Sequence, residues 1–294
     1  YDIVHSHLGH KSILTLLAAK HSGIKVRVTH AHIAFIPENT VQRLSRKTLT
    51  FLVKRLSTAL IACGNDAAQW LWGHKDFERG KIVIQNNAID VNEFCFSEEE
   101  RVRIRRRLGI DNKLVIGHVG RLCEQKNQLF CLEVLKSVVE KGSDAVLLLI
   151  GRGDEFTEQK IRAKSEELGV SERVLLLGIR TDVSKLLNAM DVFLFPSIYE
   201  GLPFTLIETQ CNGLFALCSD AVTPQVKISE CIQFKSLLDD AESWANDLLL
   251  LAKKERKKEA YMDVIRAGYD INTEAVKLKG FYENQLLYKG LKSK

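Results

Sequence analysis

The sequence lacks paired cysteines. It contains seven cysteines, an odd number, and none of them forms a Cys-x-x-Cys pair. This distribution argues against a disulfide framework and against a structural zinc site of the Cys-rich type. Free thiols are typical of a reducing compartment, so we expect a cytoplasmic protein.

Long apolar runs and low-complexity tracts are missing as well. The longest apolar runs, such as VLLLI at 146–150, are far shorter than the roughly 20 residues that span a bilayer. We find no pattern of a signal peptide and no polar tract of the kind that stays disordered. With 294 residues, of which 46% are hydrophobic, the chain is large enough for two folded domains.

Positive charge is concentrated in the first third of the chain. Residues 1–92 hold 12 Lys and Arg against 6 Asp and Glu, whereas the remainder holds 30 against 31. Seven of the eight histidines also lie in this first part. The asymmetry fits contact with an anionic partner, and it fits an ordinary basic surface equally well.

Strand-like apolar runs alternate with helical patterns in two series, from about 2 to 87 and from about 113 to 220. This alternation predicts parallel sheets covered by helices. Between the series lies a charged helix, for which Ser97 and Glu100 form a capping box and Gly109 a stop signal. We therefore predict two Rossmann-like domains, at 1–95 and 96–271, followed by a C-terminal helix at 272–294 that starts at an Asn/Thr cap and packs back on the first domain.

The loop GRLCEQKN, at 120–127, follows an apolar strand and precedes a helix. Gly120 permits a tight turn, and Arg121 and Lys126 place two cations beside the helix N-terminus. Such a position suits an anion, and a diphosphate matches the guanidinium fork and the ammonium charge. The alternative from these residues alone is a pair of solvated surface charges.

The stretch PSIYEGLPFTLIETQCNG, at 196–213, places two glutamates in an apolar neighbourhood. Gly201 and Pro203 lead into a second helix start suited to phosphate. Glu200 precedes this helix and Glu208 lies within it, about 8–9 Å further along the axis. Their carboxylates suit hydroxyl-rich groups, since each oxygen accepts hydrogen bonds. The alternative is one helix-capping and one surface glutamate.

PSIYEGLPFTLIE resembles the Glu-x7-Glu signature of retaining GT-B glycosyltransferases, in particular family 4. HVGRLCEQKNQ resembles the phosphate-binding segment of that family, and LLLIGRGDE and VLLLGIRTDV resemble its next two strand ends. Earlier in the chain, DIVHSH…RVTHAH resembles the middle of the N-terminal domain of the family, and IACGNDAAQWLWG with IVIQNNAIDVNEF resembles the end of that domain. The resemblance covers nearly the whole chain and points to the EpsF-like exopolysaccharide and capsule transferases. It implies a GT-B fold, with two Rossmann-like domains facing each other across a cleft.

The resemblance also implies roles for individual residues. Glu208 would bind ribose, and Glu200 would contact the transferred sugar. Arg121 and Lys126 would neutralise the diphosphate, and His30, in VTHAH, would lie near the donor sugar and acceptor. The same placement is a weaker match for His5, His7 and His32, and a structural role is the alternative for an isolated histidine such as His30. The implied nucleotide-sugar-binding residues are Gly120, Gly178, Arg180, Gly201, Leu202, Phe204 and Glu208.

The implied reaction is hexosyl transfer, with retention of configuration, from a nucleoside-diphosphate sugar to a growing lipid-linked oligosaccharide in polysaccharide biosynthesis. UDP is the expected nucleotide because it is common in this group. The sequence has no Asp-x-Asp motif, which metal-dependent transferases use, so we expect no metal and no cofactor. Arg121, Lys126 and helix dipoles would then meet the charge of the leaving group. One departure is SDAVTP, which lacks the glycine pair that the family often has there.

Other functions remain open at this point. A non-catalytic nucleotide-sugar-binding protein would share the binding residues, and a GT-B-fold epimerase of UDP-N-acetylglucosamine would share the architecture. A nicotinamide dehydrogenase is disfavoured because GRGDEF lacks the third glycine of the dinucleotide fingerprint. We expect no nucleic acid partner.

The acceptor side is represented by the segment 41–58, which interleaves Arg43, Arg46, Lys47, Lys54 and Arg55 with apolar residues. It predicts either an amphipathic helix on an anionic membrane surface or a helix packed on the sheet with a basic outer face.

The resemblance further implies that the first domain is incomplete, with roughly 70–80 residues, or two to three βα units, before the opening YDIVHSH. A chain truncated in this way would expose an apolar sheet edge, and we expect it to be insoluble or inactive.

Overall fold

The computed structural model describes residues 1–32 and 39–290, which form two compact units. Unit 1 comprises 1–89 and 268–294, and unit 2 comprises 90–267. The division falls a few residues before the limits of 95/96 and 271/272 that we placed from the sequence. Among the described residues, no helix combines the length and the apolar character needed to cross a bilayer.

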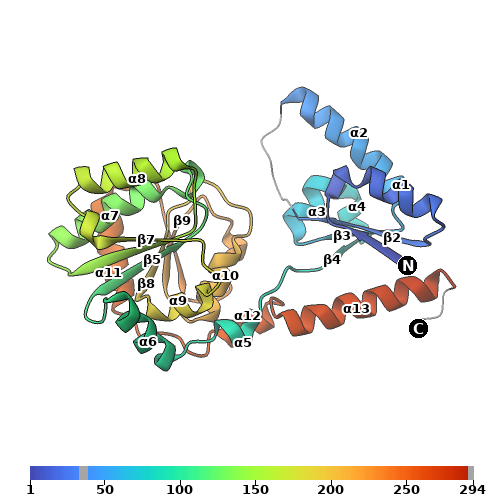
Figure 1. The fold of residues 1–294 in the computed structure, drawn as a ribbon. Helices are drawn as coiled ribbons and strands as arrows, with labels where there is room; N and C mark the ends of the chain where they lie inside the picture. The colour runs from blue at the N-terminus through green and yellow to red at the C-terminus, as the bar shows by residue number, and fades with distance from the viewer. Residues whose placement is uncertain (33–38, 291–294) are drawn as a thin grey trace. The chain divides into compact units, whose positions relative to one another are not determined.

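Unit 1 is built on a four-stranded parallel sheet of order β1-β2-β3-β4 (Figure 1). Its strands are β1 (Ile3–Ser6), β2 (Val26–Ala31), β3 (Ala59–Ala62) and β4 (Ile82–Ile84). Its helices are η1 (Gly9–Lys11), α1 (Ile13–His21), α2 (Thr40–Leu56), α3 (Asn65–Trp72), α4 (His74–Glu78) and α13 (Ile271–Tyr288).

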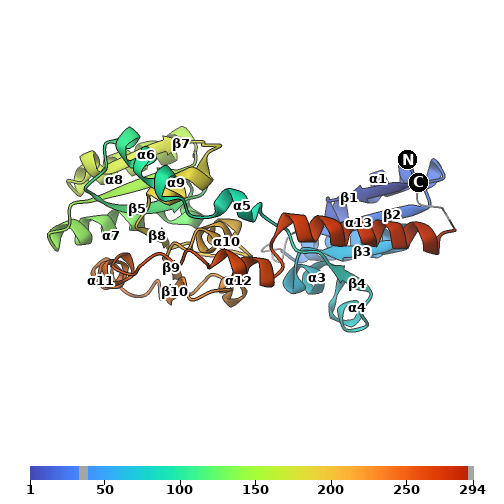
Figure 2. The same ribbon diagram turned by 90° about the horizontal axis from the view of Figure 1, so that it is seen from below.

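The last helix of the chain, α13, returns to the sheet of unit 1, where it runs alongside the strands in both views (Figures 1 and 2). Leu278 and Phe281 pack against buried valines of β2. The Gln85 amide donates to the buried carboxylate of Glu274 over 2.7 Å. The Asn/Thr cap predicted for this helix is wrong, because the N-cap is Asp270, whose carboxylate accepts from the backbone N–H of Thr273.

Unit 2 holds a six-stranded parallel sheet of order β10-β9-β8-β5-β6-β7. Its strands are β5 (Leu114–Val119), β6 (Ala145–Ile150), β7 (Val174–Gly178), β8 (Val192–Phe195), β9 (Ala216–Ser219) and β10 (Ile232–Lys235). Its helices are α5 (Val91–Phe94), α6 (Glu98–Leu108), η2 (Glu124–Lys126), α7 (Gln128–Glu140), α8 (Glu155–Glu167), η3 (Ser171–Arg173), α9 (Val183–Ala189), α10 (Phe204–Cys211), η4 (Pro224–Val226), α11 (Ala241–Ala252) and α12 (Tyr261–Arg266).

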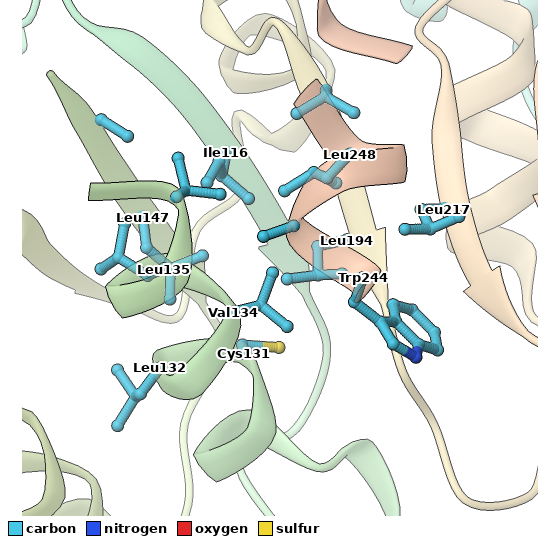
Figure 3. Close-up of a cluster of buried hydrophobic side chains, with 14 of the residues drawn as sticks. Ile116, Cys131, Leu132, Val134, Leu135, Leu147, Leu194, Leu217, Trp244 and Leu248 are labelled. Carbon is cyan, nitrogen blue, oxygen red and sulfur yellow. The ribbon is translucent and has the colours of Figure 1, made fainter. Parts of the chain in front are cut away.

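The core of unit 2 lies between this sheet and helices α7 and α11 (Figure 3). Leu135 of α7 and Trp244 of α11 are fully buried against strand residues such as Ile116. The stop signal predicted for α6 is confirmed, because Gly109 has the left-handed φ of 68° that favours glycine. The predicted capping box is only half formed: Ser97 Oγ accepts from the Glu100 N–H, but the Ser97 N–H donates to Asn188 Oδ1 and the Glu100 carboxylate pairs with Arg103.

The strand order contains a switch that positions the candidate site. β5 pairs with β6 on one side and with β8 on the other, although β8 comes three strands later in the chain. All the pairs are parallel, so the carboxyl ends of β5 and β8 meet at one edge of the sheet. Ligands in open α/β sheets bind at such a switch point.

Candidate active site

The loops that follow β5 and β8, at 120–127 and 196–203, are joined by hydrogen bonds. The backbone N–H of Ile198 donates to the carbonyl of Gln125 over 2.8 Å. The Gln125 side-chain amide donates to the Tyr199 carbonyl, also over 2.8 Å. The two segments that we singled out in the sequence therefore form one surface.

An ion pair lies where these two loops meet. Lys126 Nζ is 2.6 Å from Glu200 Oε1, and the two side chains are only 15% and 11% exposed. The Lys126 ammonium also lies 4.7 Å from the ring centroid of Phe195, within cation–π range. A buried charge needs a partner of opposite charge, and here the Lys126 ammonium and the Glu200 carboxylate are partners of each other.

Two glycines allow the backbone to pack closely around Lys126. A Cβ at Gly120 would lie 3.1 Å from Lys126 Cε. A Cβ at Gly151 would lie 1.9 Å from the carbonyl oxygen of Gly120, a distance that no side chain tolerates, and Gly151 also has a φ of 140°. Glycine at 151 is therefore required for this loop to take its shape, whereas a side chain at 120 would require Lys126 to shift by a few tenths of an ångström.

A buried network that we did not predict supports the same loop. His118 of β5 is fully buried, and its Nδ1 lies 2.9 Å from the Leu194 carbonyl, so Nδ1 carries the proton. The Gln128 amide lies 3.2 Å from His118 Nε2 and donates to the Arg121 carbonyl over 3.0 Å. Burial lowers the pKa of His118 to about 4, so this imidazole is neutral. A histidine inside an otherwise apolar strand was the only sequence signal of this network.

The second helix start is that of α10, which begins at Phe204 with Pro203 as its N-cap. The side chain of Pro203 makes no capping hydrogen bond. Glu208 lies further along the helix, where burial and the neighbouring carboxylate of Glu93 raise its pKa to about 7. Glu93 comes from α5 and accepts from the Ser184 hydroxyl over 3.0 Å. No local pattern in the sequence indicates that Glu93 lies near Glu208, because the two glutamates are far apart in the chain.

The remaining predicted residues lie around these loops in different settings. Arg121 is exposed, and within the described parts of the chain no acidic group pairs with it. Arg180 makes a bidentate pair with Asp182, at 2.8 and 2.7 Å, which lowers the pKa of Asp182 to about 2. Gly178 ends β7 with a φ of 66°. Gly201 is exposed, and Leu202 and Phe204 are half-buried.

His30 belongs to unit 1, where β2 holds it in a group with His5, His7 and His32. It is 4% exposed. Burial, with the neighbouring histidines, lowers its pKa to about 2, so its imidazole is neutral.

Comparison with known proteins places this chain in a family. Residues 1–93 match the model of the Glycosyltransferase Family 4, and residues 113–254 match that of the Glycosyl transferases group 1. The chain is 32% identical over 288 residues to the glycosyltransferase-family protein EpsF of Bacillus subtilis (strain 168), covering 96% of this chain and 74% of EpsF. The chain is a family 4 glycosyltransferase.

Two further proteins are similar to this family 4 glycosyltransferase over nearly its whole length. A UDP-Gal:alpha-D-GlcNAc-diphosphoundecaprenol alpha-1,3-galactosyltransferase of Escherichia coli is 28% identical over 305 residues, covering 98% of this chain and 77% of that enzyme. The crystal structure of Anabaena HepE in complex with UDP superimposes with a TM-score of 0.80 at 18% identity, covering 97% of this chain and 79% of HepE. The family, the GT-B fold class and the enzyme class predicted from the sequence are confirmed.

Proposed function

We propose that this glycosyltransferase moves a hexosyl group from a UDP-sugar to a lipid-linked saccharide, with retention of configuration, in polysaccharide biosynthesis. The observation that carries the proposal is the Lys126–Glu200 ion pair at the strand switch point, beside the start of α10. The names of the Escherichia coli relative and of the HepE complex, which specify a UDP-Gal donor and bound UDP, support the choice of nucleotide. The diphosphoundecaprenol-linked acceptor of the former supports a lipid-linked acceptor here.

The diphosphate takes the place that Glu200 holds beside Lys126 in the ligand-free protein. Lys126 then faces the phosphates, together with Arg121 and the backbone of Gly201, Leu202 and Phe204 at the start of α10. Glu200, released from the pair, accepts hydrogen bonds from hydroxyls of the transferred sugar. This exchange leaves no buried charge without a partner at any stage.

The nucleoside extends to the other predicted residues. Glu208 accepts hydrogen bonds from the ribose hydroxyls, and the strand end from Gly178 to Arg180 borders the base. On the phosphate side, the absence of a side chain at Gly120 gives the phosphates room beside Lys126. His30 is assigned to the donor-sugar and acceptor side. Because its imidazole is neutral, it acts there as a hydrogen-bonding group without positive charge.

The chemical step breaks the bond between the anomeric carbon and a phosphate oxygen, and it forms a bond from that carbon to the acceptor oxygen on the same face of the sugar. The acceptor hydroxyl gives its proton to the leaving phosphate. Negative charge grows on the diphosphate, where Lys126, Arg121 and the α10 dipole stabilise it in a fixed arrangement. These groups supply the countercharge that a metal supplies in other transferases, so we propose a reaction without metal or cofactor.

The test is a thermal-shift screen of the full-length protein against UDP-, GDP- and ADP-sugars, followed by transfer of a radiolabelled sugar to a lipid-linked acceptor. We expect the UDP-sugars to raise the melting temperature most and the label to enter the lipid fraction in the presence of EDTA. Binding without transfer would favour a nucleotide-sugar-binding protein. Conversion of the donor sugar in the absence of acceptor would favour an epimerase.

Helix α2 packs within unit 1 and also leaves an apolar and basic face exposed. Lys54 pairs with Asp76 at 2.7 Å, and the Arg46 guanidinium lies 4.4 Å from the ring centroid of Trp70, so these two cations hold the helix on unit 1. The opposite side exposes an apolar stripe that includes Leu44 and Phe51, which are 66% and 54% exposed. Exposed basic residues adjoin this stripe, namely Arg43, Lys47 and Arg55. We propose that this face contacts an anionic membrane surface.

We expect the full-length protein to sediment with phosphatidylglycerol vesicles and much less with phosphatidylcholine vesicles. The double variant Leu44→Ser with Phe51→Ser should lose most of this binding, because it removes the apolar area that enters the headgroup region. Leu250→Ser, at a 62% exposed leucine on α11, is the matched control and should bind as the wild type does. Absence of sedimentation with either lipid would refute the membrane contact.

A further inference from the structure

Two His-x-His sequences stand on neighbouring strands of unit 1. His5 lies in β1 and His7 just after it, while His30 lies in β2 and His32 just after it. The strands are parallel, with His5 opposite Val28 and Ser6 opposite Thr29. Because side chains alternate between the faces of a strand, all four imidazoles project from the same face, at the carboxyl edge of the sheet.

The four rings form a compact group, which we call the histidine array. Ring centroids are 4.2 Å apart for His5 and His7, 4.0 Å for His30 and His32, and 5.3 Å for His5 and His30. One nitrogen each of His5, His7 and His30 lies within 4.8 Å of the other two. Among the described residues this is the only group of three or more potential ligands that meets so closely.

Several nitrogens of the array are buried without a partner. Neither His30 nitrogen has a hydrogen-bond partner within the described structure, although the side chain is 96% buried. The Nε2 atom of His5 is likewise buried and unpartnered. Buried polar atoms in proteins nearly always have partners, so these nitrogens point to a ligand that all of them share.

The other nitrogens are held by a second set of contacts. His5 Nδ1 lies 2.6 Å from the hydroxyl of Tyr282 on α13, which leaves Nε2 as the nitrogen directed at the array. His7 Nδ1 lies 2.7 Å from His32 Nε2, so each of these rings orients the other. Hydrogen bonds of this kind fix the tautomer and the orientation of histidines that bind metals.

We propose that His5, His7 and His30 bind one divalent transition-metal ion, with His32 and Tyr282 as supporting contacts. Imidazole is a preferred ligand for Zn²⁺, Cu²⁺ and Ni²⁺, and the array contains no carboxylate of the kind that Mg²⁺ or Ca²⁺ requires. Zn–N bonds of about 2.0–2.1 Å require the three nitrogens to approach to about 3.4 Å, a movement of about an ångström for side chains at strand ends. Three protein ligands leave a fourth position for water.

This inference concerns unit 1 alone and goes beyond the proposed transfer reaction, in which the diphosphate needs no metal. Metal binding and sugar transfer are therefore separate measurements. A chelator should empty the histidine array and leave transfer active, because Lys126 and Arg121 supply the charge that stabilises the diphosphate.

The test uses the full-length protein without an affinity tag, stripped of metal by a chelator and dialysed. Co²⁺ is titrated and followed by visible absorption, and Zn²⁺ is titrated in a calorimeter, both without nucleotide or acceptor. We expect one ion per chain and the absorption bands of a low-coordinate Co²⁺ site with nitrogen ligands. His30→Ala and the closer mimic His30→Gln should abolish binding, and Tyr282→Phe should weaken it about tenfold.

The matched control is His21→Ala, at an exposed histidine that ends α1 outside the array, which should bind as the wild type does. Circular dichroism establishes that each variant is folded. The inference is overturned if the wild type binds no Co²⁺ or Zn²⁺, or if the folded His30→Gln variant binds as tightly as the wild type. Neither outcome depends on whether the protein transfers sugar.

Discussion

Lys126→Ala should lower the turnover number for sugar transfer by about 10²–10³-fold, the usual loss when one preorganised group that stabilises developing charge is removed. In the proposed mechanism Lys126 faces the site of that charge, and its side chain is only 15% exposed, so water replaces it poorly. The substitution also leaves the carboxylate of Glu200 buried without its partner. Steady-state kcat and KM with a UDP-sugar donor and a lipid-linked acceptor measure the effect.

Arg121→Ala and Glu200→Ala should also lower turnover by orders of magnitude, whereas wild-type turnover should be the same with and without EDTA. Lys136→Ala is the matched control, because Lys136 is an exposed lysine of α7 whose carboxylate neighbour, Glu140, is also on the surface. Its activity should equal that of the wild type. Full activity of Glu200→Ala would remove the assignment of Glu200 to the transferred sugar.

The affinity for a UDP-sugar should rise about tenfold per pH unit below pH 7 and become constant above it. In the free protein the pKa of Glu208 is about 7, so its carboxyl group is protonated at pH 5. The ribose hydroxyls are bound best by the ionised carboxylate, and binding therefore releases a proton. Isothermal titration calorimetry between pH 5 and 8, in buffers of different ionisation enthalpy, measures both the affinity and the released proton.

The Glu208→Gln variant is the control for this pH dependence. It should bind the UDP-sugar weakly at every pH and release no proton. A UDP-sugar is the right probe because its diphosphate, esterified at both ends, does not titrate in this range. A wild-type affinity that stays constant from pH 5 to 8 would contradict the assignment of Glu208 to the ribose.

Glu208 also links the stability of the free protein to pH. Its pKa is raised by folding, from 4.5 to about 7, so the folded state binds the proton more tightly than the unfolded state does. The stabilisation that this proton provides is complete below pH 4.5 and is lost as the pH rises through about 7. A bound nucleotide that favours the carboxylate should weaken this dependence.

Most of the fold could be predicted from the periodic apolar patterns of the sequence. The alternation of strand-like and helix-like segments was sufficient for two α/β units, because the periods of 2 and 3.6 are local properties of the chain. Ser97 and Gly109 marked the ends of α6 correctly, since capping depends on neighbouring residues. The start of α13 was predicted at the wrong residue, because Asp270, Asn272 and Thr273 all favour the N-cap position. Only the backbone conformation in the structure identifies Asp270 as the N-cap.

The reactive groups were visible in the amino-acid sequence: in unit 2 the basic pair, the two glutamates and the glycines that let loops turn, and in unit 1 the paired His-x-His segments. Only the tertiary structure decided which of them meet. Lys126 reaches Glu200 because β5 and β8 are neighbours in the sheet, and Glu208 has a raised pKa because the fold buries it and α5 brings Glu93 beside it. Contacts between residues far apart in the chain depend on strand order and helix packing, which the whole core decides and no local pattern records.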